Sequence, residues 1–461
     1  MTDEEISMIL NTYMYMDYKE ADDGMTMKEI LSDLSGMEDY QPGGIHYGEY
    51  RVLSEAAENP EIGDLIIGNQ SHLMGCDAGT NACTFKTGDN SSIYVVYRGT
   101  GDGEWPDNGI GMTAGSTKQQ ERALSYFEAV VERENVQIEQ KLVVTGHSKG
   151  GNKAQYVTMS TKYDALLDAC YNIDGQGFSE KAINGWKSRY GENYDLRRNK
   201  ITGIYGENDY VNVLGRSIVP EDKVRYIKTP VKVENFAGYH DIKYMFATLE
   251  KDPVTGDAVN VFHGEKNSYA AGRGKLGSYA ALLSLAMMNL DPDKRDGCAA
   301  SLMQLMELAG NRKTGINGEK LTLSDVRDFL GTGVPLIAES LLMTQEGREM
   351  LYKAFYKKSF SQDVNGHIAV MVNYSALLRQ SLELQKMAGR LKEYREEMED
   401  VGNRLPEFMK SSWLMLHKIK KETEALGKEI RELEKMSETL ENIVKTYMVK
   451  DIQAADEILM V

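Results

Sequence analysis

The most constraining feature of the sequence is a short apolar run that leads into a glycine-flanked serine and then into a helical pattern. The run is Leu142–Thr145, the turn is Gly146-His-Ser-Lys-Gly150, and residues 151–159 follow as a plausible helix. A strand, a tight turn and a helix in this order expose the central serine at the edge of a sheet. Small residues beside the serine let the chain turn without clashing. The segment therefore predicts a strained, exposed serine at position 148.

Other segments in the first 270 residues predict the same class of fold. Ser92–Tyr97 and Ile201–Tyr205 are apolar runs with the length of buried strands. Thr117–Glu134 carries apolar residues at helical spacing. Alternating strands and helices favour an α/β fold with a mainly parallel sheet that is covered on both faces.

A serine nucleophile needs a base, and the base needs an acid that orients it. The histidines after Ser148 are His240, His263, His367 and His417, and the last two lie in a helical region. His240 lies in a loop that leads into a helix, whereas His263 ends a strand-like run. Catalytic residues are frequent in loops, so we favour His240 as the base and keep His263 as the alternative.

The acid should follow a strand, and the oxyanion of the reaction needs backbone donors. Asp209 lies in the turn after the apolar run that starts at Ile201, with Glu207 as the nearby competitor. The first predicted donor is the N–H of Lys149, the residue after the serine. The second is Thr100, through its N–H and its hydroxyl, because it lies in a turn directly after the run Ser92–Tyr97. No metal or cofactor is needed for this chemistry.

Charge and composition exclude several other classes of protein. The chain has 461 residues and a net charge of −17, which argues against nucleic acid as a main partner, because phosphate binding needs concentrated Lys and Arg. Four cysteines are too few for a disulfide framework, and no Cys/His cluster has zinc spacing. The acidic N-terminus lacks the apolar stretch of a Sec signal peptide, and no apolar run approaches the ~20 residues of a membrane span. We therefore expect a protein made in soluble form in the cytoplasm.

From about Gly274 onward the strand signals vanish. We expect residues 271–365 to form a helical middle segment, with helices at 279–290, 299–309, 323–330 and 335–355. Such a segment would fit either a spacer or a cover over the first domain. Residues 366–461 carry two heptad-patterned helices around a break that holds Gly402, Pro406 and Trp413, and a short break favours a long antiparallel hairpin. The predicted seam residues are Leu384, Met387, Leu391, Tyr394, Met398, Val401 and Leu405, then Leu416, Ile419, Thr423, Leu426, Ile430, Leu433, Ser437, Leu440, Val444 and Tyr447.

Two motifs of the first domain resemble those of known lipases. Val-Val-Tyr-Arg98-Gly99-Thr100 looks like the Arg-Gly-Thr oxyanion segment of class 3 lipases, which have the α/β-hydrolase fold. Val-Val-Thr-Gly-His-Ser-Lys-Gly-Gly-Asn152 is similar to the serine turn of a bacterial branch of that group, as are Asn172–Phe178 and the Asp209 turn. The resemblance covers roughly residues 1–265 and implies ester hydrolysis on acyl lipids. The step from Asp209 to His240 is shorter than in the fungal enzymes, and His263 would restore the longer spacing.

The C-terminal region resembles another family. It has two amphipathic helices, a tryptophan between them, and Tyr447-Met-Val-Lys-Asp451 at the end of the latter helix. These features are similar to the WXG/LXG helical hairpins of type VII secretion, whose export signal is Tyr-x-x-x-Asp. Trp413 is followed by Leu-Met rather than by x-Gly, which departs from the family. A lipase followed by such a hairpin resembles the reverse-arranged lipase toxins. This resemblance implies an exported antibacterial lipase, small helical targeting partners for the hairpin and an immunity protein.

The sequence leaves two other functions open. One is an intracellular esterase or thioesterase whose C-terminal coiled coil only serves oligomerisation. The other is a non-catalytic binding module on a hydrolase scaffold. Labelling of Ser148 by a fluorophosphonate probe would argue against the binding module, and cleavage of phospholipid bilayers would argue against the intracellular esterase.

Overall fold

A computed structural model describes residues 1–77, 79–101, 104–231, 236–252, 256–309, 384–385, 387–400 and 420–439 of the chain. The chain divides into two compact units, Met1–Ser340 and Leu341–Val461. Several positions that the sequence singles out lie outside the described residues, including the helices expected at 323–330 and 335–355, Trp413, Tyr447 and Asp451.

A seven-stranded sheet forms the centre of the described part of the first unit, and its strands follow one another in sequence order. The strands are β1 (Ile66–Gly68), β2 (Ala82–Lys86), β3 (Ser92–Tyr97), β4 (Lys141–His147), β5 (Ala169–Ile173), β6 (Ile201–Gly206) and β7 (Val224–Ile227). β1, β2 and β3 pair antiparallel, whereas β3 to β7 pair parallel. The structure confirms the predicted α/β domain with a mainly parallel sheet.

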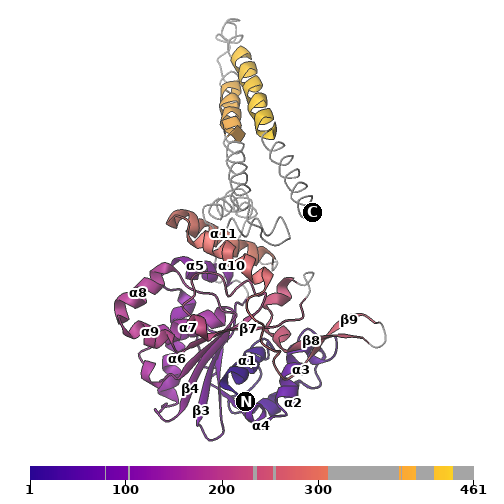
Figure 1. Cartoon of the computed structure of the whole chain (residues 1–461), viewed down its shortest axis with the longest axis vertical. Helices are drawn as coiled ribbons and strands as arrows, with labels where there is room; N and C mark the ends of the chain where they lie inside the picture. Colours follow the sequence, from indigo (N-terminus) through magenta and orange to yellow (C-terminus); the bar gives the residue numbers. More distant parts are fainter. Residues whose placement is uncertain are drawn as a thin grey trace, which may run out of the picture. The chain divides into compact units, whose positions relative to one another are not determined.

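Helices cover both faces of this sheet (Figure 1). The N-terminal helices α1 (Asp3–Tyr13), α2 (Met27–Leu34), α3 (Tyr47–Ala56) and α4 (Pro60–Gly63) contribute to the core on one face. The helices α6 (Lys118–Arg133), α7 (Lys149–Ser160), α8 (Glu180–Tyr190) and α9 (Asn193–Arg198) contribute to the core on the other face. Tyr94 and Val96 of β3 point into the first core, while Ile93, Val95 and Tyr97 point into the second. This alternation is what a strand buried on both faces requires.

Local signals explain where several helices begin. The Thr117 hydroxyl accepts from the N–H of Gln120, and the Gln120 side chain accepts from the N–H of Thr117, which is a capping box at the start of α6. Thr2 and Glu5 form the same arrangement at the start of α1. α1 is also tied to the sheet, because the Asn11 amide donates to the Thr145 hydroxyl of β4 at 2.8 Å.

Several of the remaining elements follow the carboxyl ends of parallel strands. α5 (Trp105–Thr113) follows β3, and the 3₁₀ segments η4 (Phe236–His240) and η5 (Ile242–Phe246) follow β7. A small hairpin of β8 (Ala247–Lys251) and β9 (Ala258–Phe262) comes next. Shorter 3₁₀ turns are η1 (Glu38–Tyr40), η2 (Asp164–Leu166) and η3 (Glu221–Lys223).

The described start of the middle segment packs over α5. It consists of α10 (Lys275–Met288) and α11 (Pro292–Ala309), close to the predicted helices at 279–290 and 299–309. Met112 of α5 shares an apolar cluster with Met287, Ala299 and Met303, so this part of the segment acts as a cover. No helix among the described residues is long and apolar enough to cross a bilayer.

In the second unit the structure describes two helical segments, 384–400 with a gap at 386, and 420–439. The Gln385 amide donates to the Ser437 hydroxyl at 3.0 Å, and Lys392 pairs with Glu434 at 2.6 Å. The later residue of the first segment, Lys392, thus contacts the earlier residue of the second segment, Glu434. The two described segments therefore run antiparallel.

The seam between the two segments differs in part from the predicted one. Thr423, Ile430 and Ser437 are buried, as expected for seam residues. The predicted seam also includes Met387 and Tyr394, but these are 43% and 60% exposed, while the small Ala388 is buried instead. Apolar residues spaced three and four positions apart can place more than one face of a helix in the seam. In this structure the small side chain of Ala388 lies at the contact, in place of the larger Met387.

Candidate active site

Ser148 occupies the sharp turn between β4 and α7. Its backbone is at φ 60° and ψ −126°, a region that costs about 1–3 kcal/mol for a residue with a side chain. The turn is held in place because the Ser148 N–H donates to the Ile173 carbonyl of β5 at 2.9 Å. Gly150 is needed at the start of α7, since a Cβ there would collide with the carbonyl of Tyr97. The local sequence thus creates the strained turn that the pattern predicts, but Ser148 is buried rather than exposed, with only 5% of its surface accessible.

His240 and Asp209 complete a hydrogen-bonded chain with this serine. His240 Nε2 lies 2.8 Å from Ser148 Oγ, and His240 Nδ1 lies 2.6 Å from Asp209 Oδ1. The other oxygen of the fully buried Asp209 accepts from the N–H of Val211 at 3.1 Å and from both the N–H and the side-chain amide of Asn212 at 2.7 and 2.6 Å. Three donors on one oxygen hold the carboxylate in its orientation towards the imidazole.

The structure also separates the alternatives for the base and the acid. His263 lies at the end of β9, where its Nε2 hydrogen-bonds with the Thr248 hydroxyl at 2.8 Å. Asp209, rather than Glu207, contacts the imidazole of His240. The geometry therefore groups Ser148, His240 and Asp209.

One predicted oxyanion donor belongs to the serine turn and the other lies in a loop beside it, since a Cβ on Gly99 would lie 3.1 Å from Ser148 Cβ. Lys149 is the first residue of α7, and Thr100 lies in the loop between β3 and α5. The Thr100 hydroxyl accepts from the Asn108 amide at 2.9 Å, so its own proton is free to donate elsewhere. In the same loop, the Gly101 N–H donates to the Glu104 carboxylate at 2.8 Å.

The side chain of Lys149 has a structural partner. Its ammonium is fully buried and lies 2.8 Å from a carboxylate oxygen of Asp107 in α5. Burial alone would raise the pKa of Asp107, but the Lys149 ammonium and further hydrogen bonds lower it below its usual value. The pair ties α5 to the start of α7 and so holds the loop with Thr100 beside the serine turn.

Two more cations hold this loop. The buried Lys153 ammonium donates to the carbonyls of Gly79 at 2.6 Å, Thr80 at 3.3 Å and Arg98 at 3.4 Å. Burial lowers the pKa of Lys153 to about 8. Arg98 itself pairs with Asp17 at 2.8 Å, which connects the loop to the segment after α1.

Another set of polar residues lies directly behind the base. The His147 ring stacks on the His240 ring, with centroids 4.8 Å apart and an angle of 29°. The Tyr15 hydroxyl lies 2.6 Å from His147 Nδ1, and Asp174 lies 4.0 Å from His147 Nε2. Asp174 follows β5 at a positive φ of 46° and accepts from the Gly206 N–H at 2.8 Å.

The electrostatics behind the base favour neutral groups. Burial, together with the nearby charge of His240, lowers the pKa of His147 well below its usual range. Burial and the charge of Asp209 raise the pKa of Asp174 well above its usual range. These shifts favour an uncharged His147 and a protonated Asp174.

His147, Asp174 and His240 could together be considered as metal ligands, since one polar atom from each lies within 4.8 Å of the others. Both nitrogens of His240 are already engaged by Ser148 and Asp209. The His147 and His240 rings are also stacked, so their in-plane lone pairs do not converge on one ion. The arrangement fits proton transfer better than metal binding.

Sequence reasoning missed Tyr15, His147 and Asp174 as parts of this site. Asp174 could have been found, because it follows a strand and so lies at the same edge of the sheet as the serine. Tyr15 offered no signal, since it approaches from the end of a helix and is 132 positions away from His147.

Residues 58–204 match the model of the Mbeg1-like family, which is lipase-like. The match covers β1 to most of β6, and it includes Ser148, Thr100 and Lys149. Asp209, His240 and the helices α1 to α3 lie outside it. The chain matches no curated protein. The family match and the α/β fold indicate a lipase-like hydrolase.

Proposed function

We propose that this protein is a serine ester hydrolase that cleaves acyl esters of phospholipids or glycerolipids. The observation that carries the proposal is the chain of contacts from Ser148 Oγ through the imidazole of His240 to Asp209, with distances of 2.8 and 2.6 Å. A nucleophile, a base and an orienting acid at hydrogen-bond distances are what acyl transfer requires. The lipase-like family match supports the same class of reaction.

In the proposed mechanism, Ser148 Oγ attacks the ester carbonyl while His240 Nε2 takes the hydroxyl proton. The imidazolium then donates this proton to the leaving alcohol, and an acyl-serine remains. A water molecule, deprotonated by the same nitrogen, attacks the acyl group and releases the fatty acid with the serine restored. Asp209 holds Nδ1 protonated and stabilises the positive charge that forms on the ring.

The oxyanion of both tetrahedral intermediates needs donors that are in place before the reaction. We assign this role to the Lys149 N–H, which is not bonded within its helix because it lies in the first turn of α7, and to the N–H and hydroxyl of Thr100. The positions of both are supported by the buried Lys149–Asp107 pair and by the Asn108 hydrogen bond to Thr100.

Hydrolysis is tested with the native protein and Ser148→Ala on mixed phospholipid vesicles, with mass spectrometry of the released products. We expect fatty acid and lysophospholipid from the native protein only, and labelling of the native protein by a fluorophosphonate probe. His263→Ala serves as the matched control and should retain full activity, because its imidazole contacts Thr248. Ester hydrolysis that survives in Ser148→Ala would overturn the proposal.

We further propose that the enzyme is an antibacterial toxin exported by a type VII secretion system through its C-terminal region. The support is the resemblance of residues 366–461 to the family's helical hairpins, and the antiparallel contact of the segments 384–400 and 420–439 is compatible with it. Small helical proteins should bind this region, and an immunity protein should protect the producing cell.

Export is tested by expressing the full chain in a bacterium with a type VII system and in the same strain without it. The protein should appear in the medium only in the first case, and Tyr447→Ala should abolish its export. Equal export from both strains would contradict the proposed route.

A further inference from the structure

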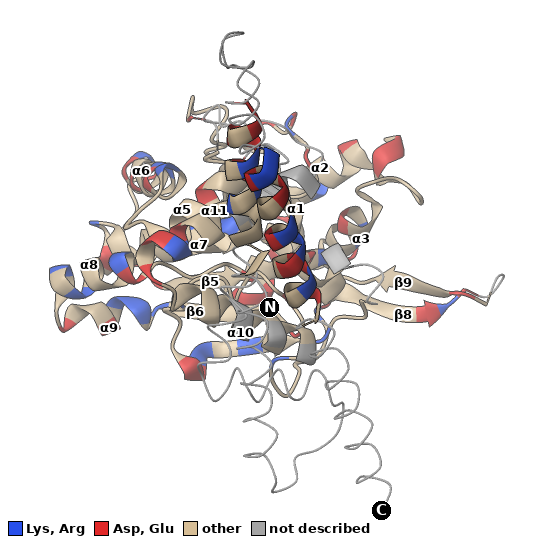
Figure 2. Ribbon diagram, turned by 90° about the horizontal axis from the view of Figure 1, so that it is seen from above, with Lys and Arg blue, Asp and Glu red and all other residues tan. Residues whose placement is uncertain are grey.

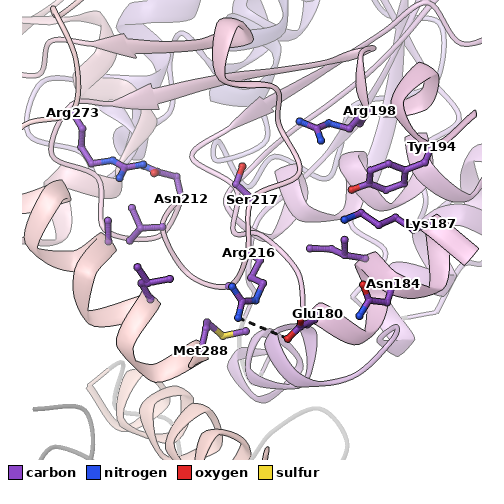
Figure 3. A pocket seen from close by; sticks show the side chains of 15 residues that line it. Glu180, Asn184, Lys187, Tyr194, Arg198, Asn212, Arg216, Ser217, Arg273 and Met288 are labelled. Atoms are coloured by element: carbon purple, nitrogen blue, oxygen red, sulfur yellow. Dashed lines mark ion pairs between the residues drawn. The ribbon is translucent and has the colours of Figure 1, made fainter. Parts of the chain in front are cut away.

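A pocket with a cavity volume of about 490 Å³ lies beside the catalytic acid. Helices α8 and α9 form one wall, α10 forms another, and the loop between β6 and β7 separates them (Figure 3). The charged side chains that line it are Lys187, Arg198, Arg216, Arg273 and Glu180. Four cations and one carboxylate line this pocket in a chain that carries a net charge of −17, so its charge is opposite to that of the whole molecule.

The four cations are only partly neutralised by protein groups. Arg216 pairs with Glu180 at 3.8 Å, and Arg198 pairs with Asp195 at 3.5 Å. Lys187 and Arg273 have no carboxylate within ion-pair distance among the described residues. Each lies over an aromatic ring instead, at 5.7 Å from the ring centroid.

Arg216 contributes a further unsatisfied group. Its Nε is buried and has no hydrogen-bond partner among the described residues, although one terminal nitrogen donates to the Asn289 side chain at 3.1 Å. Figure 2 shows that basic residues also gather on the neighbouring α9. Free guanidinium and ammonium donors around one cavity favour a ligand that accepts several hydrogen bonds and carries negative charge, and a phosphate group meets both conditions.

The same pocket also has an apolar side. Ile183, Val213, Ala281, Leu285 and Met288 line it, and Leu285 of α10 is 45% exposed. A large exposed apolar side chain next to unpaired cations suits an amphiphile better than a small soluble anion. The neighbouring pocket of about 570 Å³ shares Arg198, Asn212, Ser217 and Arg273 with the first, so there is room for a group larger than phosphate alone.

The pocket shares its wall with the catalytic acid. Asn212 lines the pocket and also donates twice to Asp209 Oδ2. The start of α10 is close as well, because a Cβ on Gly277 would lie 3.0 Å from Arg273 Cγ and 3.2 Å from the Asp209 carbonyl oxygen. A ligand in the pocket would therefore lie next to the turn that orients the base.

We propose that this pocket binds the phosphate group of an anionic phospholipid, with the cations on the phosphate and α10 against the lipid's apolar part. The proposal rests on the proposed lipid substrate and adds a preference for membranes that carry negative phosphate headgroups. It gives a strongly acidic protein a local site with which it can hold an anionic lipid surface that its net charge would repel.

The test measures binding without turnover, in the full chain with Ser148→Ala. Vesicles of phosphatidylcholine alone are compared with vesicles of equal parts phosphatidylcholine and phosphatidylglycerol. We expect Lys187→Glu with Arg273→Glu to weaken binding to the phosphatidylglycerol vesicles by about tenfold or more. The matched control is Lys19→Glu with Lys118→Glu, which makes the same change in net charge at two exposed lysines outside the pocket.

Equal binding by the pocket variant and the control variant would overturn the proposal. A further arm titrates inorganic phosphate into both variants by calorimetry. If phosphate binds to the control variant and not to the pocket variant, while both kinds of vesicle bind equally well, the site belongs to a soluble phosphate and the lipid assignment is wrong. A failure of Ser148 to react with fluorophosphonate would contradict the proposed hydrolysis and leave this binding result unaffected.

Discussion

Asp209→Asn tests the orientation of the base most directly, because the structure dictates how the new amide must lie. Asp209 Oδ2 accepts three hydrogen bonds, from the N–H of Val211 and from two groups of Asn212. An NH₂ group cannot replace an oxygen that faces three donors. The amide nitrogen must therefore take the position of Oδ1, which is 2.6 Å from His240 Nδ1.

In that position the amide donates to Nδ1 and selects the wrong tautomer of the imidazole. The ring proton moves to Nε2, which faces Ser148 Oγ at 2.8 Å and can then no longer accept the serine proton. The imidazolium that forms in the reaction also loses its charged partner. Replacing the acid of a Ser-His-Asp triad in this way lowers kcat by about 10⁴-fold, which corresponds to about 5.4 kcal/mol in the activation barrier.

Asp174→Asn is the matched control, because it makes the same chemical change in the other buried acid. Asp174 accepts from the Gly206 N–H, whereas the hydrogen bonds of the His240 ring found among the described residues are with Asp209 and Ser148. Burial and the charge of Asp209 raise the pKa of Asp174 well above its usual range, which favours its protonated form. An amide in its place exchanges one neutral group for another, and we expect kcat to stay within about tenfold of the native value.

Both variants are measured by initial rates on a soluble short-chain ester at pH 7, with circular dichroism to verify that each remains folded. The assignment of Asp209 is refuted if Asp209→Asn keeps most of the native kcat. It is also refuted if Asp174→Asn loses as much, because the two carboxyls would then share the role of orienting the base.

Three further predictions concern the surroundings of the triad. Lys149→Met leaves the buried carboxylate of Asp107 without its ammonium, which should destabilise the fold by about 3–5 kcal/mol and lower the urea midpoint. Gly99→Ala places a Cβ against the Tyr15 hydroxyl, and a shift of the loop by about 1 Å should reduce kcat by about 10²-fold with little change in KM. Because burial and the charge of His240 lower the pKa of His147, only the unfolded chain takes up a proton there below pH ~6.5. Stability should therefore fall as the pH drops through that value, and melting curves of His147→Asn should show a shallower fall; equal slopes would contradict a neutral His147.

The parts of this protein that the sequence predicts are those with local signals. The strand, turn and helix around Ser148 are consecutive, and Asp209 follows its strand within a few residues. A preference for loops favours His240 over His263. The structure places His240 within hydrogen-bond distance of Ser148 and Asp209, and its role as the base stays a prediction. The pattern at 384–398 is less informative. It allows either Met387 or Ala388 in the seam between the two helices. Which of the two is buried depends on the side chains of the facing helix, and the spacing within one helix does not specify them.

The charges buried around the site escape prediction for a related reason. In the sequence, Lys149 and Lys153 resemble surface residues of an exposed helix. Both are almost fully buried, because each has partners that come from distant segments of the chain. Burying an ammonium is tolerated only when such partners are present, and a pattern of residue types does not show them.

The same dependence on distant contacts explains why Tyr15 and Asp17, near the N-terminus, lie beside the candidate site. Arg98 of the oxyanion loop pairs with Asp17, and Tyr15 lies between that loop and His147, with its hydroxyl 2.6 Å from Nδ1. His147 in turn stacks on His240, the proposed base. The segment after α1 therefore contacts both the loop that should stabilise the oxyanion and the support of the imidazole. Since the Mbeg1-like match begins only at residue 58, a fragment limited to the matched residues would contain the serine but would lack this support, as well as the base and the acid.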